Sequence, residues 1–318
     1  MQRYFLIFSI IFLSYLLLIN YNPPVQESIS ENILNDSEYS QTIETDDFVS
    51  RNDIVGEETF LTAETCAEND TYSFFNENWT AKIDLKTGKI VYAELIKFPE
   101  NAGSEINKLI FNDCGLERYS QLSGFAFLNQ NESSNSLFKV SENYKDGINN
   151  VFVLEKKSNN LLTKKIISFG PKDYYLKIKD SVQNLDFTEI KLAPFSKIDR
   201  SSEIVEAKGS GFTDPSSFAY LGPAFRTTEE NYLKIPFNDV AENNFKQAST
   251  DGWAAMLQHY FLSAVVPSDN QNYVFQAKQK NNGDYSIGIV GQTISLASEE
   301  SSIFNHKVYF GPKVQSEL

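Results

Sequence analysis

The chain has 318 residues, a formal charge of −14 and 41% hydrophobic residues, enough to bury a core in one large domain or two small ones. The acidity is concentrated in residues 22–70, where 13 acidic residues stand against one basic residue, Arg51. The rest of the chain therefore carries only −2 of the −14. A nearly neutral remainder argues against a nucleic-acid partner.

The first predicted element is a transmembrane helix over residues 1–21, built on the uncharged apolar run Tyr4–Ile19. As a helix, the 16 residues of this run would cover about 24 Å, close to the thickness of a bilayer's hydrocarbon core. Arg3 precedes the run and the acidic stretch follows it, so the positive-inside rule predicts a cytoplasmic N-terminus. The alternative is a signal peptide cleaved near Ser28–Ser30.

Residues 22–70 are rich in Ser, Asn, Thr, Glu and Asp. Such a composition buries too little apolar surface to fold by itself, and its like charges repel one another. We therefore expect a disordered acidic linker, which holds a folded domain away from the membrane surface.

Residues 71–318 are predicted to form a mainly β domain, because short alternating segments are separated by turn residues and the chain is rich in Phe and Tyr. One turn, Lys86-Thr87-Gly88, places glycine where a left-handed conformation is needed. The overall prediction is an antiparallel β-sandwich of a single domain. Three hairpins are expected, pairing residues 79–85 with 90–98, 166–169 with 174–180, and 273–277 with 285–289.

The run Trp253–Val266 is apolar without a clear period, so it predicts either one buried helix or two buried strands. Either alternative makes Trp253 a core residue.

Few residues point to chemistry. Of the two histidines, His259 lies in an apolar run and is expected to be structural, while His306, between Asn305 and Lys307, is expected to face solvent. Phosphate-binding loops, nucleophile elbows and metal-ligand spacings are absent from the sequence. We therefore assign no catalytic, cofactor-binding or metal-binding residues and expect no cofactor and no enzymatic activity.

The two cysteines, Cys66 and Cys114, leave two alternatives open. If the anchor places them in an oxidising compartment, a disulfide between them is possible, and the alternative is two independent small buried residues.

Three segments carry a resemblance to a known family. They are Asp251–Phe261 (DGWAAMLQHYF) with Pro267 after it, Tyr220–Phe225 (YLGPAF) upstream, and Val308–Lys313 (VYFGPK) downstream. In this order they resemble the large periplasmic domain of the YidC-type membrane protein insertases of Gram-negative bacteria. The order of anchor, polar linker and β-rich domain also resembles that family over essentially the whole chain.

The resemblance implies a galactose mutarotase-like β-supersandwich with short helical elements at its end, and strands rather than a helix in Trp253–Val266. It also implies a task, the insertion and folding of new inner-membrane proteins, alone or with the Sec translocon. The partners implied are Sec translocon components, nascent inner-membrane proteins and the lipid bilayer, the last through Tyr4–Ile19. The localisation implied is the bacterial inner membrane, with the domain in the periplasm.

One departure from the family stands out. In the family, the Gly-Pro signature leads into five further helices that carry the insertion groove, whereas this sequence ends at Leu318. We therefore expect this chain to act as a docking or spacing module, and it is either a fragment or the product of a split gene. The rival interpretations are a membrane-tethered β-sandwich that binds carbohydrate or peptide, and a mutarotase-like enzyme.

Overall fold

The computed structural model describes residues 70–100, 103–128, 136–158, 160–202 and 220–313. The predicted transmembrane helix and nearly all of the predicted linker lie outside these ranges. Within them, no helix combines the length and the apolar character needed to cross a membrane. The described residues form a domain that begins at Asp70.

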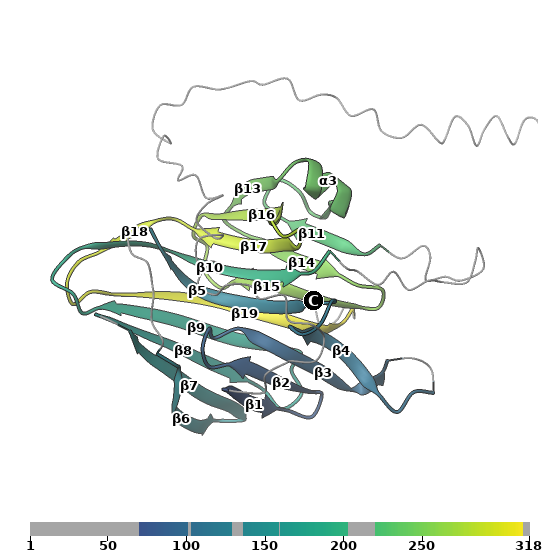
Figure 1. Cartoon of the computed structure of the whole chain (residues 1–318), viewed down its shortest axis with the longest axis horizontal. Helices are drawn as coiled ribbons and strands as arrows, with labels where there is room; N and C mark the ends of the chain where they lie inside the picture. Colours follow the sequence, from purple (N-terminus) through teal and green to yellow (C-terminus); the bar gives the residue numbers. More distant parts are fainter. Residues whose placement is uncertain (1–69, 101–102, 129–135, 159, 203–219, 314–318) are drawn as a thin grey trace, which may run out of the picture. The chain divides into compact units, whose positions relative to one another are not determined.

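The domain consists of two large antiparallel sheets (Figure 1). Sheet A has ten strands, nine of them in the order β1-β2-β3-β4-β5-β10-β17-β16-β13, while β18 pairs with β10. Its strands are β1 (Thr71–Phe75), β2 (Trp79–Asp84), β3 (Ile90–Pro99), β4 (Asn107–Asn112), β5 (Tyr119–Phe127), β10 (Ile190–Arg200), β13 (Phe245–Ser249), β16 (Tyr273–Gln279), β17 (Tyr285–Gly291) and β18 (Ile294–Leu296).

Sheet B has nine strands in the order β12-β11-β14-β15-β19-β9-β8-β7-β6. They are β6 (Lys139–Asp146), β7 (Asn149–Ser158), β8 (Leu161–Phe169), β9 (Tyr175–Asn184), β11 (Gly222–Arg226), β12 (Leu233–Lys234), β14 (Trp253–Leu257), β15 (Phe261–Pro267) and β19 (Ser301–Pro312). Among the described residues the helical element is α3 (Phe237–Glu242), which begins after Pro236 and buries Val240. The prediction of an antiparallel β-supersandwich is confirmed.

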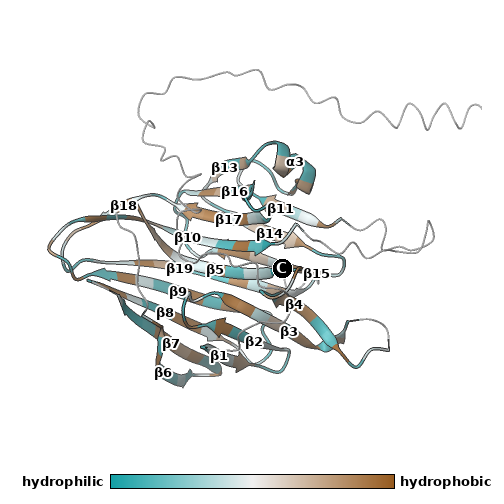
Figure 2. Cartoon of the chain, viewed as in Figure 1, coloured by the Kyte–Doolittle hydropathy of each residue, from teal (hydrophilic) through white to brown (hydrophobic). Residues whose placement is uncertain are grey.

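All three predicted hairpins are present as antiparallel pairs: β2 with β3, β8 with β9, and β16 with β17. Gly88 has φ +74°, the left-handed conformation expected at its turn. In β9, Leu176 and Ile178 are buried while Lys177 and Lys179 are exposed, the alternation typical of a strand with one face in the core. Figure 2 shows the same alternation of hydrophobic and hydrophilic residues along many strands.

The core lies between the sheets and is centred on aromatic rings. Trp79 of sheet A is 0% exposed, and its ring centroid lies 5.0 Å from that of Phe169 and 5.2 Å from that of Phe310, both in sheet B. Its indole Nε1 donates a hydrogen bond to the carbonyl oxygen of Asp173 (2.7 Å), so the polar atom of this buried side chain is satisfied. These contacts join the two sheets into one hydrophobic core.

The run Trp253–Val266 forms two strands, β14 and β15. The helix alternative is therefore wrong, and the strands that the resemblance implied are confirmed. The expectation that Trp253 is a core residue is also wrong, because its side chain is only half-buried and lies on the outward face of sheet B. The short helical elements expected at the end of the domain do not appear within the described part of the chain, which ends in β19.

The expectation that His306 faces solvent is wrong. His306 is 1% exposed, because it lies on the inward face of β19 between Phe304 and Val308. Its polar neighbours Asn305 and Lys307 point to the opposite face, as successive residues of a strand do.

Candidate docking surface

The outward face of sheet B contains an apolar groove of about 340 Å³. It is lined by side chains from four adjacent strands, β14, β15, β19 and β9, and by residues that follow β11 and β19. We call it the sheet B groove. Its lining residues are Tyr175, Tyr232, Trp253, Ala255, Leu257, Leu262, Ala264, Val266, Lys307, Tyr309 and Lys313.

The depth of the groove comes from small residues placed side by side. Ala255 of β14 pairs with Ala264 of β15, and both line the groove, so two alanines on adjacent strands form a low floor. On the next strand Ala264 pairs with Tyr309, whose ring rises at one side. Because paired residues of neighbouring strands point to the same face, this alignment produces a hollow between aromatic walls.

Glycines in the segments that carry the family resemblance shape this region. A Cβ on Gly252 would lie 1.9 Å from the carbonyl oxygen of Arg226, so only glycine lets β14 begin so close to the end of β11. Gly252 also has φ +139°, which side chains disfavour. A Cβ on Gly311 would lie 2.8 Å from the ring of Tyr174, so this glycine makes room for an aromatic ring over β19.

Four lysines lie in or beside the groove, and we call them the lysine rim: Lys307 and Lys313 line it, while Lys177 and Lys234 lie near the rings of its lining residues Tyr175 and Tyr232. Lys177 and Lys307 face each other across the β9–β19 pair, and both ammonium groups lie near the ring of Tyr175, at 5.9 and 5.7 Å from its centroid. The ammonium group of Lys234 lies 5.4 Å from the centroid of the Tyr232 ring. Like charges placed directly opposite each other destabilise a sheet, so this arrangement costs stability.

The lysine rim is uncompensated within the described part of the chain, where no carboxylate forms an ion pair with any of its four members. Burial, together with the nearby ammonium group of Lys234, lowers the pKa of Lys313. Its Nζ donates to the carbonyl oxygen of His259 (3.1 Å). A hollow with an apolar floor, aromatic walls and a cationic rim fits a segment that is both apolar and acidic.

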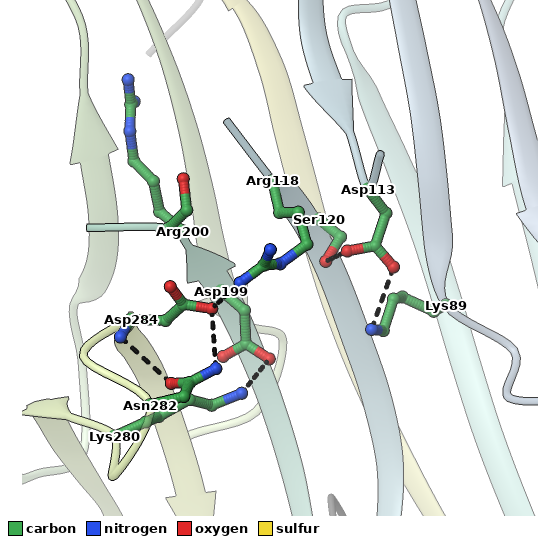
Figure 3. Close-up of a pocket in the computed structure, with 10 residues that line it drawn as sticks. Lys89, Asp113, Arg118, Ser120, Asp199, Arg200, Lys280, Asn282 and Asp284 are labelled. Carbon is green, nitrogen blue, oxygen red and sulfur yellow. Dashed lines mark hydrogen bonds and ion pairs between the residues drawn. The ribbon is translucent and has the colours of Figure 1, made fainter. Parts of the chain in front are cut away.

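A second hollow, of about 150 Å³, lies on sheet A and is lined by charged side chains (Figure 3). Each of its three carboxylates is paired: Asp113 with Lys89 (3.1 Å), Asp284 with Arg118 (2.8 Å), and Asp199 with Lys280 (3.2 Å). Arg200 contributes to the wall of this hollow, but its guanidinium points away from the cluster in Figure 3. Apart from Arg200, the charged groups that line this hollow are thus paired with one another.

The charges around this second hollow determine the protonation states of Asp199 and Lys89. Burial by itself raises the pKa of Asp199, but the ammonium groups of Lys197, Lys280 and Lys89 outweigh it and hold that pKa well below its usual range. The neighbouring carboxylates Asp113 and Asp199 in turn raise the pKa of Lys89, against the effect of burial. The carboxylate of Asp199 is therefore ionised and has no proton to donate near neutral pH.

A buried polar cluster joins the two sheets. Lys165 of β8 donates to Asp180 Oδ1 of β9 (2.5 Å) and to the hydroxyl of Ser123 of β5 (2.8 Å). His306 Nδ1 lies 3.8 Å from Asp180 Oδ2, and burial lowers the pKa of His306 to about 3. The imidazole is therefore neutral at physiological pH, and the described groups around it lie between the sheets, away from the groove.

The other residues singled out in the sequence are now placed. His259 lies in the turn between β14 and β15, where its ring is 5.0 Å from that of the exposed Tyr260. Cys114 is disulfide-bonded, and the only other cysteine of the sequence, Cys66, lies outside the described residues. Across the described ranges, no three His, Cys, Asp or Glu side chains gather in a way that could hold a metal ion.

Two packed antiparallel sheets define a β-supersandwich domain, and one outward face of it carries an apolar groove. A family model described as the YidC periplasmic domain matches residues 72–318. The chain therefore belongs to the YidC periplasmic domain family.

Relatives named membrane protein insertase YidC agree with this assignment. One, from Pseudoalteromonas atlantica, is 28% identical over 75% of this chain and 44% of its own length. Another, from Haemophilus influenzae, is 24% identical over 100% of this chain and 57% of its own length. The chain thus spans about half the length of the relatives it matches.

Solved structures with a similar arrangement of strands include two galactose mutarotase relatives. One is a galactose mutarotase-like protein from Lactobacillus casei, with TM-score 0.48 and 11% identity over 76% of this chain and 100% of that chain. The other is a galactose mutarotase related enzyme from Lactobacillus acidophilus, with TM-score 0.49 and 9% identity over 77% of this chain and 98% of that chain.

Proposed function

We propose that this chain is the N-terminal part of a membrane protein insertase, and that its β-supersandwich acts as a periplasmic docking module for partly inserted membrane proteins. The observation that carries the proposal is the sheet B groove, in a domain that belongs to the YidC periplasmic family. Apolar polypeptide segments that have crossed a membrane need a temporary binding surface in water, and an open apolar groove provides one.

The shape and chemistry of the groove support polypeptide as the ligand. The alanine floor lets an extended backbone approach sheet B closely, while Trp253, Tyr175 and Tyr309 offer rigid aromatic surfaces for its side chains. The lysine rim favours clients that carry acidic residues beside their apolar ones.

A binding role without catalysis is part of the proposal. Paired acids or a free histidine are what a sugar-processing site uses for proton transfer. In the second hollow each carboxylate is instead paired with a cation, and His306 is buried between the sheets with a low pKa. These arrangements support a docking module rather than a mutarotase-like enzyme.

The topology belongs to the same proposal. Residues 1–21 would anchor the chain in the inner membrane with the N-terminus in the cytoplasm, residues 22–70 would form a linker, and residues 71–318 would fold in the periplasm. The module would receive its clients alone or together with the Sec translocon. Protease added to spheroplasts should then digest the domain and leave a small membrane-bound N-terminal piece, whereas a mature N-terminus near Glu31 would contradict the anchor.

The experiment that tests docking uses the full chain in inverted inner-membrane vesicles, with benzoylphenylalanine in place of Tyr232. This residue lines the groove and is 53% exposed. We expect cross-links to a stalled nascent chain of a single-span inner-membrane protein. The matched control replaces Tyr144 of β6, which is 46% exposed at the far edge of the same sheet. Equal yields from both positions would contradict docking in the groove.

A further inference from the structure

The lysine rim stands out against the charge of the whole chain. The protein carries −14, yet four lysines gather around one groove, two of them directly opposite each other, with no carboxylate partner among the described residues. Because these lysines repel one another, this face of the sheet is suited to bind an anionic ligand that offsets their repulsion.

The most acidic part of the protein is its own N-terminal linker. Residues 44–60 (ETDDFVSRNDIVGEETF) hold six acidic residues and one basic residue, Arg51. Apolar residues lie directly beside the acidic ones, as in Asp47-Phe48-Val49 and Asp53-Ile54-Val55. The stretch therefore combines the two properties that the groove selects, apolar side chains for the floor and walls and carboxylates for the rim.

We propose that residues 44–60 of the same chain dock in the sheet B groove, with apolar side chains between Trp253 and Tyr309 and carboxylates against the lysine rim. The segment would then be an intramolecular ligand of the groove. This proposal builds on the groove as a docking surface, but it concerns a different occupant.

The length of the linker permits this contact. Residues 44–60 lie 10 to 26 positions before Asp70, where the described domain begins, which gives a reach of about 33 to 86 Å at roughly 3.3 Å per residue. A domain of this size has a radius of gyration of about 18 Å, so the segment can reach either face. Because the segment is covalently attached, its effective concentration is in the millimolar range, and modest affinity suffices to keep it docked.

Arg51 makes the proposal testable, because it is the only trypsin site between residues 22 and 70. Cleavage tracks the population of the open form, so a segment docked nine-tenths of the time is cut about tenfold more slowly. In the full chain in non-ionic detergent, the triple variant Lys177→Gln, Lys234→Gln, Lys307→Gln should be cut at Arg51 about 5- to 10-fold faster than the wild type. Higher salt should accelerate wild-type cleavage in the same direction.

The matched control is Lys86→Gln, Lys139→Gln, Lys145→Gln, which removes three exposed lysines away from the groove and should leave the rate unchanged. Both triple variants change only exposed side chains, so both should fold. Equal cleavage rates in the wild type and the groove variant would overturn the proposal.

A second measurement identifies the occupant. Benzoylphenylalanine at position 232 of the full chain, reconstituted with phosphatidylglycerol and without any client, should cross-link to a peptide within residues 44–60 of the same chain. Cross-links to lipid or to a second copy of the protein would overturn self-docking. Because no client is present, failure here leaves client docking standing, and a failed client cross-link leaves self-docking standing.

Discussion

The inward and outward faces of sheet B both contact tryptophan side chains, but in different surroundings. Its inward face meets sheet A around Trp79, which is 0% exposed and surrounded by the rings of Phe74, Phe169 and Phe310. Its outward face carries Trp253, half-buried beside an open groove with lysines around it. An aromatic residue that is covered by its own chain stabilises the fold, whereas one left beside an unfilled hollow is available for a partner.

The largest expected effect is at Trp79. Trp79→Ala should lower the free energy of unfolding by about 3–5 kcal/mol, because it empties a fully buried site and removes the hydrogen bond to Asp173. Chemical denaturation followed by near-ultraviolet circular dichroism measures this loss. A loss below about 1 kcal/mol would mean that the inward face is not the core.

The buried ion pair should come next. Asp180→Asn should cost about 3–5 kcal/mol, because it leaves the Lys165 ammonium group buried without its counter-charge. In the double variant Lys165→Met, Asp180→Leu no charge is left unpaired, so much of the stability should return. Equal losses in the single and double variants would show that the pair does not act as a unit.

The cysteines test the attachment of the linker to the domain. A bridge between Cys66 and Cys114 closes a loop of about fifty residues and should contribute about 2–4 kcal/mol in the chain-entropy model. Non-reducing mass spectrometry of the periplasmic domain should show the pair oxidised, and Cys114→Ser should lower the denaturation midpoint. Two thiols that alkylate without reductant would refute the pairing.

His306 predicts how stability depends on pH. Because burial lowers its folded-state pKa to about 3 from an ordinary value of 6.5, its contribution is present above pH 6.5 and is lost as pH falls toward 3. The loss should be about 1.4 kcal/mol per pH unit in that window. His306→Phe should remove this part of the slope, and identical slopes in the variant and the wild type would contradict a neutral buried imidazole.

The smallest expected change in stability is at Trp253. Trp253→Ala should lower the free energy of unfolding by no more than about 1 kcal/mol. Much of the side chain already faces the groove, so its removal leaves no closed cavity inside the protein. Thermal unfolding beside Trp79→Ala gives the comparison directly. A loss of stability as large as that of Trp79→Ala would mean that Trp253 is a core residue.

The contrast between the two faces also bears on what could be predicted from the sequence. The hairpins followed from alternating residues and turn chemistry, because one face of those strands is buried and the other is solvated. Trp253 was misplaced because β14 is apolar on both faces, which removes the period-two signal. His306 was misplaced through its adjacent polar neighbours, although Phe304 and Val308, two positions away, share its face and were the better guide.

The groove itself could not be predicted from the sequence. It depends on Ala255, Ala264 and Tyr309 lying side by side, which is a matter of strand order and register. The paired lysines at positions 177 and 307 are 130 residues apart and become neighbours only when β9 meets β19. Long-range pairings of this kind leave no local signal.

The most direct test of docking on the outward face of sheet B is the yield of nascent-chain cross-links from position 232 in the Trp253→Ala variant, measured alongside its thermal midpoint. We expect a midpoint within a few degrees of the wild type and a client cross-link yield at least fivefold lower, because a residue of the docking surface is lost while the fold remains. An unchanged cross-link yield in this folded variant would contradict the claim that the outward face of sheet B holds client polypeptide.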